Sequence, residues 1–237
     1  MESKTIQHKG MKLTGIMKLA IVCPGPGRPH GAIVLLAGED AVVIQDKFSG
    51  SIQKRAEEAV NFVEEFKPRV DYQTITVDAA DDGWELAEEM KRLFRKKNLA
   101  YEKEIERFQA FSWDTPFNYP HARFADRRSE DYWKLKARID DNALKIHGDP
   151  GDLDRIGRSH KNGKIEISDR ETLEREGINA AVPDALALSL SFSGEVPEDY
   201  EQPTTELMFN YGYGELREDP DYDIMPDSYR RLNPRFS

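Results

Sequence analysis

Three polar side chains stand where apolar stretches end or begin, positions at which a folded chain can bring distant residues together for chemistry. Cys23 follows the apolar run "LAIV", Asp78 closes "TITVD", and Asp184 lies near the start of "PDALALSLSF". Carboxylates gathered in this way can hold two divalent cations about 4 Å apart, which activate water and stabilise the leaving oxygen in phosphodiester cleavage. Aspartate is also a common turn or cap residue, so spacing alone leaves both interpretations open.

The apolar pattern predicts the elements that would position Cys23 and Asp78. It indicates, in chain order, strands over 17–23, 31–37 and 41–45, a helix over 51–66, a strand over 74–78 and a helix over 82–97. Short turns join the first three strands, so we expect an antiparallel meander within an α/β fold that has a mixed central sheet flanked by helices. In a sheet of this order the first and fourth strands can be neighbours, which would bring Cys23 and Asp78 to one edge.

The second half of the chain is more polar, and its pattern predicts shorter elements. It favours a strand over 105–111, a helix over 126–142, a helix or turn over 149–158, a strand over 163–168, a short helix over 169–177 and an apolar helix over 183–192. Pro183 suits the first turn of that last helix. Asp184 would therefore lie at a helix N-terminus that can approach the strand ends.

The charge distribution divides the chain into three parts. Residues 193–237 contain 11 acidic and 4 basic residues, a net charge of −7, whereas the whole chain of 237 residues carries −10. We therefore expect an acidic tail over 193–237 that is flexible or bound by a partner. The folded domain is expected over 17–192, from the first predicted strand to the end of the last predicted helix, and is preceded by an N-terminal extension over 1–16. The folded domain is closer to neutral and can present a local basic face.

Composition narrows the class of protein. Cys23 is the single cysteine, which excludes an intramolecular disulfide and a cysteine-cluster zinc site. Apolar runs stay shorter than the roughly 18 residues of a membrane span, and "MESKTIQHKG" lacks the apolar core of a signal peptide. We expect a cytoplasmic protein without a membrane partner.

Four strings, in order along residues 17–192, resemble the C-terminal nuclease domain of the large terminase subunit of tailed phages, which has an RNase H-like fold. "IVCPGPGRPHGAIVLL" is similar to the opening hairpin of that family, and "ITVDAADDGWELAEEMKRL" is similar to its second acidic segment. "FADRRSEDYWKLKARIDDNALKIHGDPGDLDRIGR" and "NGKIEISDRETLEREGINAAVPDALALSLSF" resemble its later helix and its closing string. The resemblance implies a metal-dependent DNA endonuclease, a hydrolase that cuts concatemeric DNA for packaging.

The family's catalytic and metal-binding positions are matched unevenly. Asp78 falls on the second acid and Asp184 on the last aspartate of the closing string, which implies that both bind Mg²⁺ or Mn²⁺. Cys23 occupies the position of the first acid. A thiol is a poor replacement for a carboxylate that bridges two magnesium ions. We therefore expect magnesium-dependent cleavage to be weak or absent.

Other positions leave alternatives open. Ala181 and Asp169 stand where the family has an aspartate and a lysine. Cys23 can be a small buried hydrophobe at a strand end. If another side chain completes the metal site, the candidates are His30, Asp46, Asp81 and Asp82.

Basic side chains in the second half could form a surface that contacts the phosphates of double-stranded DNA. The candidates are Arg127, Arg128, Lys134, Arg158, Lys161 and Lys164. Acidic residues alternate with them, so solvated helix faces are the alternative interpretation.

Two functional classes follow from the sequence. The first is a divalent-metal-dependent endonuclease, favoured by the pattern around Asp78 and Asp184; the second, favoured by Cys23, is a weakened or inactive module that binds DNA, a packaging ATPase or the portal. The sequence contains no phosphate-binding loop of the ATPase type. The expected partners are therefore DNA, a separate packaging ATPase chain, the small terminase subunit or the portal, in the cytoplasm of the host cell.

Overall fold

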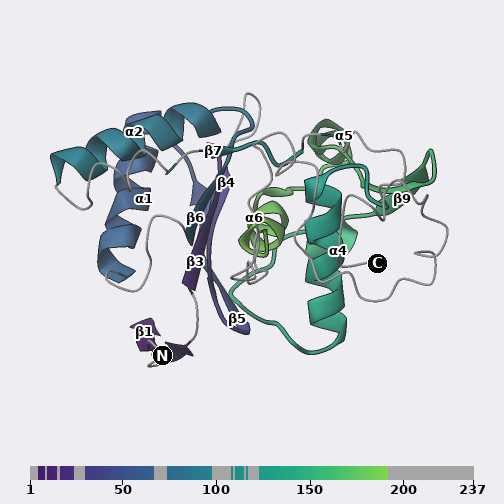
Figure 1. Ribbon diagram of the computed structural model, residues 1–237, viewed down its shortest axis with the longest axis horizontal. Helices are drawn as coiled ribbons and strands as arrows, with labels where there is room; N and C mark the ends of the chain where they lie inside the picture. The colour runs from purple at the N-terminus through teal and green to yellow at the C-terminus, as the bar shows by residue number, and fades with distance from the viewer. Residues whose placement is uncertain are drawn as a thin grey trace, which may run out of the picture.

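A six-stranded mixed sheet forms the centre of the molecule (Figure 1). The computed structural model describes residues 5–8, 10–14, 17–23, 30–66, 74–97, 108, 110–114, 116 and 123–191. The sheet has the order β7-β6-β3-β4-β5-β8. Within these residues no helix is both long enough and apolar enough to span a bilayer.

The predicted meander and its neighbour strand are confirmed. β3 (Met17–Val22), β4 (Gly31–Ala37) and β5 (Asp40–Phe48) pair antiparallel in sequence order. β6 (Ile75–Asp78) lies parallel to β3, with Ile21 beside Val77. The outer strands β7 (Ala110–Phe111) and β8 (Lys145–His147) pair parallel to β6 and β5.

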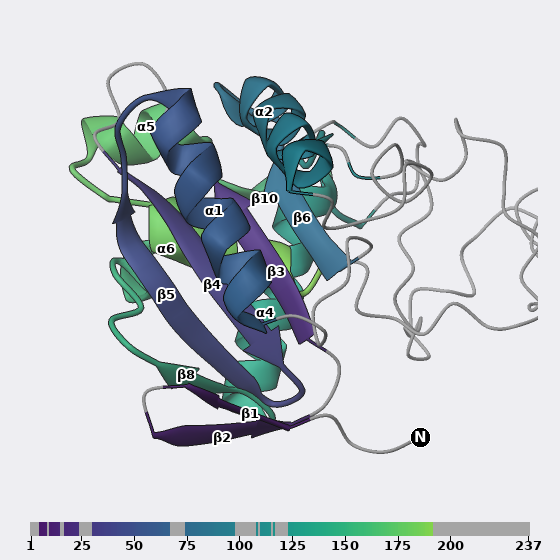
Figure 2. The same ribbon diagram turned by 90° about the vertical axis from the view of Figure 1, so that its left-hand side faces the viewer.

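Two helices cover one face of the sheet (Figure 2). α1 (Ile52–Phe66) begins after Ser51, whose Oγ accepts a hydrogen bond from the Lys54 amide at 3.3 Å. α2 (Gly83–Lys96) begins so close to β6 that a Cβ on Gly83 would lie 1.7 Å from the carbonyl oxygen of Asp78. Glycine at this position therefore lets the helix start directly beside the strand end.

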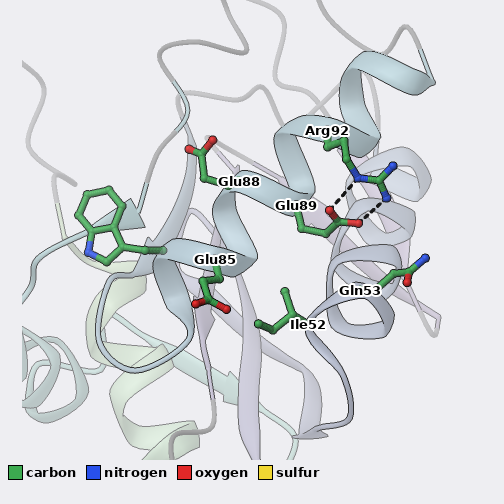
Figure 3. A pocket seen from close by; sticks show the side chains of 7 residues that line it. Ile52, Gln53, Glu85, Glu88, Glu89 and Arg92 are labelled. Carbon is green, nitrogen blue, oxygen red and sulfur yellow. Dashed lines mark hydrogen bonds and ion pairs between the residues drawn. The ribbon is translucent and has the colours of Figure 1, made fainter.

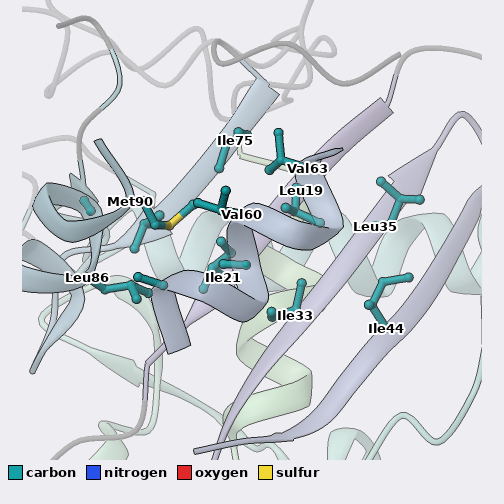
Figure 4. Packing of buried hydrophobic residues seen from close by; sticks show 14 of the residues in the cluster. Leu19, Ile21, Ile33, Leu35, Ile44, Val60, Val63, Ile75, Leu86 and Met90 are labelled. Atoms are coloured by element: carbon teal, nitrogen blue, oxygen red, sulfur yellow. The ribbon is translucent and has the colours of Figure 1, made fainter. Parts of the chain in front are cut away.

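An apolar core fills the space between these helices and the sheet (Figure 4). Side chains alternate along a strand, so every second residue of β3 and β4 points to this face. The residues that meet there include Leu19, Ile21, Ile33, Leu35, Val60, Val63, Ile75, Leu86 and Met90. Cys23 belongs to the same cluster.

The opposite face carries the elements of the second half. α6 (Ala181–Ser189) packs against β3 and β4, and α4 (Arg127–Asp140) packs on α6. α5 (Arg170–Arg175) follows a hairpin of β9 (Arg158–Lys161) and β10 (Lys164–Ile167). A single 3-10 turn, η2 (Leu153–Arg155), precedes that hairpin.

Several elements differ from the sequence-based expectation. The last helix begins at Ala181 rather than Pro183, because the Asp184 amide already donates to the carbonyl of Ala180 at 2.7 Å. β9 is not among the strands that the sequence predicts. It pairs with β10 across Asn162 and Gly163, which both have positive φ, as in a two-residue hairpin turn. Of the predicted strand over 105–111, only β7 lies in a described strand; 105–107 and 109 are outside the described residues.

The structure describes much of the expected N-terminal extension but none of the expected acidic tail. The expected N-terminal extension contains a paired hairpin of β1 (Thr5–His8) and β2 (Met11–Thr14), and Leu13 is buried in the same apolar cluster as α1 and α2. Residues 192–237 lie outside the described residues, so the role of the acidic tail stays a prediction.

Candidate site at the strand ends

Asp78 and Asp184 meet on a single guanidinium group, although they lie 106 residues apart in the sequence. Nε of Arg170 donates to Oδ2 of Asp184 at 2.6 Å, and Nη2 of Arg170 donates to Oδ2 of Asp78. Both aspartates are 1 % exposed. The structure thus brings these two predicted residues together, but in a closed environment rather than the solvent-open pocket that a nuclease site requires.

The remaining oxygens of the two carboxylates are also engaged. Oδ1 of Asp184 accepts hydrogen bonds from Nε and Nη2 of Arg128 at 3.1 and 3.0 Å and from the Tyr132 hydroxyl at 2.7 Å. Oδ1 of Asp78 accepts one from the Ala80 amide at 3.2 Å. All four carboxylate oxygens therefore have donors from the protein itself.

Burial and the arginines act in opposite directions on these carboxyls. Burial alone would raise the pKa of Asp184, but Arg128 and Arg170 outweigh it, and the pKa of Asp184 is lowered. Burial dominates at Asp78, whose pKa is raised although Arg170 opposes the shift. Asp184 is therefore the firmly ionised member of the pair.

Aromatic rings line the inner side of this cluster. The Cζ atoms of Arg170 and Arg128 lie 5.7 and 5.9 Å from the centre of the Trp113 ring, and the Cζ atom of Arg128 lies 5.2 Å from the centre of the Tyr132 ring. Trp113 is fixed in turn, because its Nε1 donates to Oδ2 of Asp131 at 2.9 Å. Positive charge packed on ring faces is favourable in such a desolvated place.

Cys23 is not part of this cluster. It belongs to the apolar cluster beneath α1 and α2, whereas Asp78 contacts groups from α5 on the other face. By the register of β3 and β6, Val22 is the neighbour of Asp78 on that face, since Ile21 pairs with Val77. The expected meeting of Cys23 with both aspartates is therefore incomplete, because side chains alternate along the strand.

The surroundings of Cys23 keep its thiol protonated. Burial raises the pKa of Cys23 to about 12, although the neighbouring Arg55 opposes the shift. Arg55 itself is buried and donates from Nη2 to Oδ2 of Asp82 at 2.6 Å. Asp82 is thus engaged in an ion pair.

The other metal-ligand candidates do not join the cluster of Asp78 and Asp184. Asp46 is exposed on β5, and Asp81 occupies a turn with positive φ. His30 is half-buried, and its Nδ1 has no hydrogen-bond partner within the described part of the chain. In the same residues no three His, Cys, Asp or Glu side chains group in a way that could hold a metal ion.

The site as folded does not fit the two-metal centre that its fold family implies. Such a centre needs unshared carboxylate oxygens and, at its middle, a bridging acid. Here Arg170 and Arg128 place positive charge against both carboxylates, and Cys23, which the sequence resemblance aligns with the first acid, is a neutral thiol in the apolar cluster on the other face of the sheet. We therefore derive no step through a bound metal.

The predicted DNA contacts divide into buried and exposed residues. Arg127 and Arg128 are 6 % and 4 % exposed, and Arg127 pairs with Glu130 at 3.2 Å, so neither can form part of a DNA-facing surface as we predict from the sequence. Lys134 also pairs with Glu130, at 2.8 Å. The helical pattern does not reveal the burial of Arg128, because its partner Asp184 lies 56 residues away and the arginine looks like any other charged helix residue.

The exposed candidates lie on the β9–β10 hairpin. Arg158 and Lys161 are exposed, and Lys164 is half-buried. Arg158 and Arg123 both lie over the ring of Trp133, with Cζ atoms 5.0 and 4.9 Å from its centre. The hairpin and α4 thus carry adjoining basic and aromatic groups.

One surface hollow of about 740 Å³ lies away from the aspartates, between the starts of α1 and α2 (Figure 3). Its walls include Ile52, Glu85, Glu88 and Glu89, and Glu89 pairs with Arg92. It contains none of the predicted site residues.

The strand order, with β4 antiparallel at its centre and helices on both faces, defines an RNase H-like α/β fold of the terminase nuclease type. Two similar solved structures are lysine-to-alanine mutants of the nuclease domain of the large terminase subunit gp2 of bacterial virus Sf6. The one with manganese and β-thujaplicinol is 16 % identical, with a TM-score of 0.51, over 74 % of this chain and 88 % of that one. The one with calcium is 17 % identical, with a TM-score of 0.52, over 76 % and 90 %.

The sequence alone matches no family model and no curated protein. The structural likeness therefore establishes the fold, and the function rests on this chain's own residues.

Proposed function

We propose that this chain is a DNA-packaging module with the fold of a terminase nuclease domain, which binds double-stranded DNA and does not cleave it by the two-metal route. The observation that supports this is the engagement of all four oxygens of Asp78 and Asp184 by Arg170, Arg128, Tyr132 and the Ala80 amide. Two-metal hydrolysis depends on those same oxygens.

In this proposal the charged cluster holds the second half of the domain on the sheet. Arg170 comes from α5, Arg128 and Tyr132 from α4, Asp184 from α6 and Asp78 from β6. Two carboxylates face two guanidiniums, so the buried charges balance. Breaking a buried pair of this kind leaves an uncompensated charge, which is strongly destabilising.

DNA binding would use the exposed basic groups rather than the buried ones. Arg158, Lys161 and Lys164 on the β9–β10 hairpin can contact phosphates, and Arg158 is pre-positioned by the ring of Trp133. Phosphate contacts give affinity without sequence preference. ATP hydrolysis would be supplied by a separate packaging ATPase, with the small terminase subunit or the portal as further partners in the host cytoplasm.

A metal-dependent endonuclease is the second candidate. The observation in its favour is that Asp78 and Asp184 do come together, in a fold whose solved neighbours were obtained with manganese and with calcium. In that case Asp78 and Asp184 would bind Mg²⁺ or Mn²⁺, and His30 or Asp82 would have to leave their present positions to complete the site.

A plasmid assay separates the two candidates. We expect the chain to retard supercoiled plasmid and to leave it uncut in Mg²⁺ and in Mn²⁺, at the same background as an Asp78→Asn/Asp184→Asn variant. Cleavage that needs metal and disappears in that variant would overturn the proposal and establish the endonuclease.

The DNA surface is tested by the salt dependence of binding. The double variant Arg158→Ala/Lys161→Ala should reduce the slope of log K against log salt by about 2, since each lost phosphate contact removes roughly 0.9. The matched control is Arg175→Ala, because Arg175 is an exposed arginine on α5. Equal slopes for the double variant and the control would show that the hairpin does not contact DNA.

A further inference from the structure

The space between Asp78 and Asp184 is filled by a positive group from the chain itself. The guanidinium of Arg170 is largely buried and donates to one oxygen of each carboxylate. A divalent cation shared by two carboxylates would bind those same two oxygens.

We propose that Arg170 is a resident cation that closes a latent divalent-cation site. Both aspartates are present, and the side chain of Arg170 between them prevents a metal ion from binding. This inference rests on the proposed function in one respect, namely that the chain as it exists does not use a metal to cut DNA.

The contacts around the two aspartates support this assignment. In each carboxylate, Oδ2 faces Arg170 while Oδ1 is held by other groups: Asp184 by Arg128 and Tyr132, and Asp78 by the Ala80 amide. Arg128 is anchored independently, since its Nη1 donates to the carbonyl of Ser168 at 2.9 Å. Removing Arg170 would therefore leave two oriented oxygens facing one vacant place.

The position of Arg170 is built into the start of α5. Asp169 caps this helix, because its Oδ1 accepts from the Thr172 amide at 2.8 Å and its Oδ2 from the Thr172 hydroxyl at 2.9 Å. The cap fixes the first turn, in which Arg170 is the first helical residue. The Trp113 ring then lies beside the guanidinium and narrows the room for movement.

The net charge of the cluster changes when Arg170 is removed. With Arg170 the two carboxylates and two guanidiniums balance; without it, Arg128 remains paired with Asp184 while Asp78 loses the guanidinium that it contacts. The net negative charge that remains in a buried place favours uptake of a cation. Neither Arg128 nor Tyr132 needs to move for this to happen, since both contact the opposite oxygen of Asp184.

The experiment measures metal binding directly, without DNA cleavage as the readout. We would titrate MnCl₂ into the full chain and into Arg170→Ala by calorimetry and follow the melting temperature with and without MnCl₂. We expect Arg170→Ala to bind Mn²⁺ about tenfold or more tighter than the unmodified chain, because a like charge is removed at contact distance. Its melting temperature should be lower in EDTA and should recover in part with MnCl₂.

Two further variants keep the test decisive. Arg170→Gln removes the charge but retains a hydrogen-bond donor, so it should fold where alanine does not and still gain Mn²⁺ affinity. Arg127→Ala is the matched control, since Arg127 is a buried arginine beside two carboxylates, Glu130 and Asp131, outside the site. It should lose stability without gaining Mn²⁺ affinity.

The outcomes separate this inference from the proposed function. If neither Arg170 variant binds Mn²⁺ better than the unmodified chain and Arg127→Ala, the latent site is wrong, whatever the plasmid assay shows. If the unmodified chain already binds Mn²⁺ tightly and cuts plasmid, both the inference and the proposed function are overturned.

Discussion

The two faces of the central sheet are built by different rules. Beneath α1 and α2 the contacts are between apolar side chains such as Leu19, Ile21 and Met90. On the other face, apolar residues of α6 surround buried charges, among them Asp78, Asp184 and Arg170. The first face can be stable by burial alone, whereas the second also depends on each charge keeping its partner.

This contrast places the candidate site on one side of a shared sheet. The β3–β6 pairing serves both faces, since alternate residues of each strand point in opposite directions. Cys23 and Asp78 lie near each other at the strand ends, yet the thiol belongs to the apolar face and the carboxylate to the charged one. A change at Cys23 alone therefore leaves Arg170 in place between the aspartates.

The largest expected effect comes from removing one charge from the face of the sheet that holds Asp78, Asp184 and Arg170, called the charged face below. Asp184→Ala removes the acceptor for Arg128, Arg170 and Tyr132 at once and leaves two buried guanidiniums with fewer partners. We expect a loss of about 3–5 kcal/mol in the free energy of unfolding, measured by urea denaturation. A loss below about 1 kcal/mol would show that the cluster is solvated and that the faces do not differ in this way.

A truncation on the apolar face should cost somewhat less and follow a different mechanism. Met90 is fully buried between α2 and the sheet. Met90→Ala should lower the free energy of unfolding by about 2–4 kcal/mol through lost burial and a residual cavity. The loss should be the same in EDTA and in MnCl₂, and a dependence on metal would mean that the two faces are coupled.

The same contrast explains what could be predicted from the sequence. The 3.6-residue spacing of Leu86, Met90, Leu93 and Phe94 predicts the inner face of α2, and all four are buried. The short turns and apolar runs likewise predict the meander and the place of β6 beside β3, both confirmed. These features follow from local periodicity and loop length, which a single sequence contains.

The charged face could be predicted only in part. Asp78 and Asp184 stand out because they end or begin apolar stretches, but Arg128 and Arg170 look like ordinary helix residues. Their partners lie 56, 14 and 92 residues away, so nothing local marks them as buried. Arg127 and Arg128, which the sequence predicts as DNA contacts, are both buried; Arg128 pairs with the distant Asp184, whereas Arg127 pairs with its near neighbours Glu130 and Asp131, so charge alone does not report exposure.

The smallest expected effect is a difference in pH dependence between the two aspartates of the site. Arg128 and Arg170 outweigh burial and lower the pKa of Asp184, whereas burial outweighs Arg170 and raises the pKa of Asp78. An acid with a lowered folded-state pKa adds stability above its unfolded pKa of about 3.9, and this stability is lost as the pH falls through the folded value. An acid with a raised pKa adds stability below about 3.9, and this is lost as the pH rises through the folded value.

Urea unfolding from about pH 3 to pH 7 should therefore show opposite trends for two variants. The stability advantage of the unmodified chain over Asp184→Asn should shrink on acidification, because protonation removes the charge that Arg128 and Arg170 hold. Relative to Asp78→Asn, the unmodified chain should lose stability as the pH rises above about 4. Parallel curves for the two variants would mean that Arg170 serves both carboxylates equally, and the asymmetry within the charged face would have to be given up.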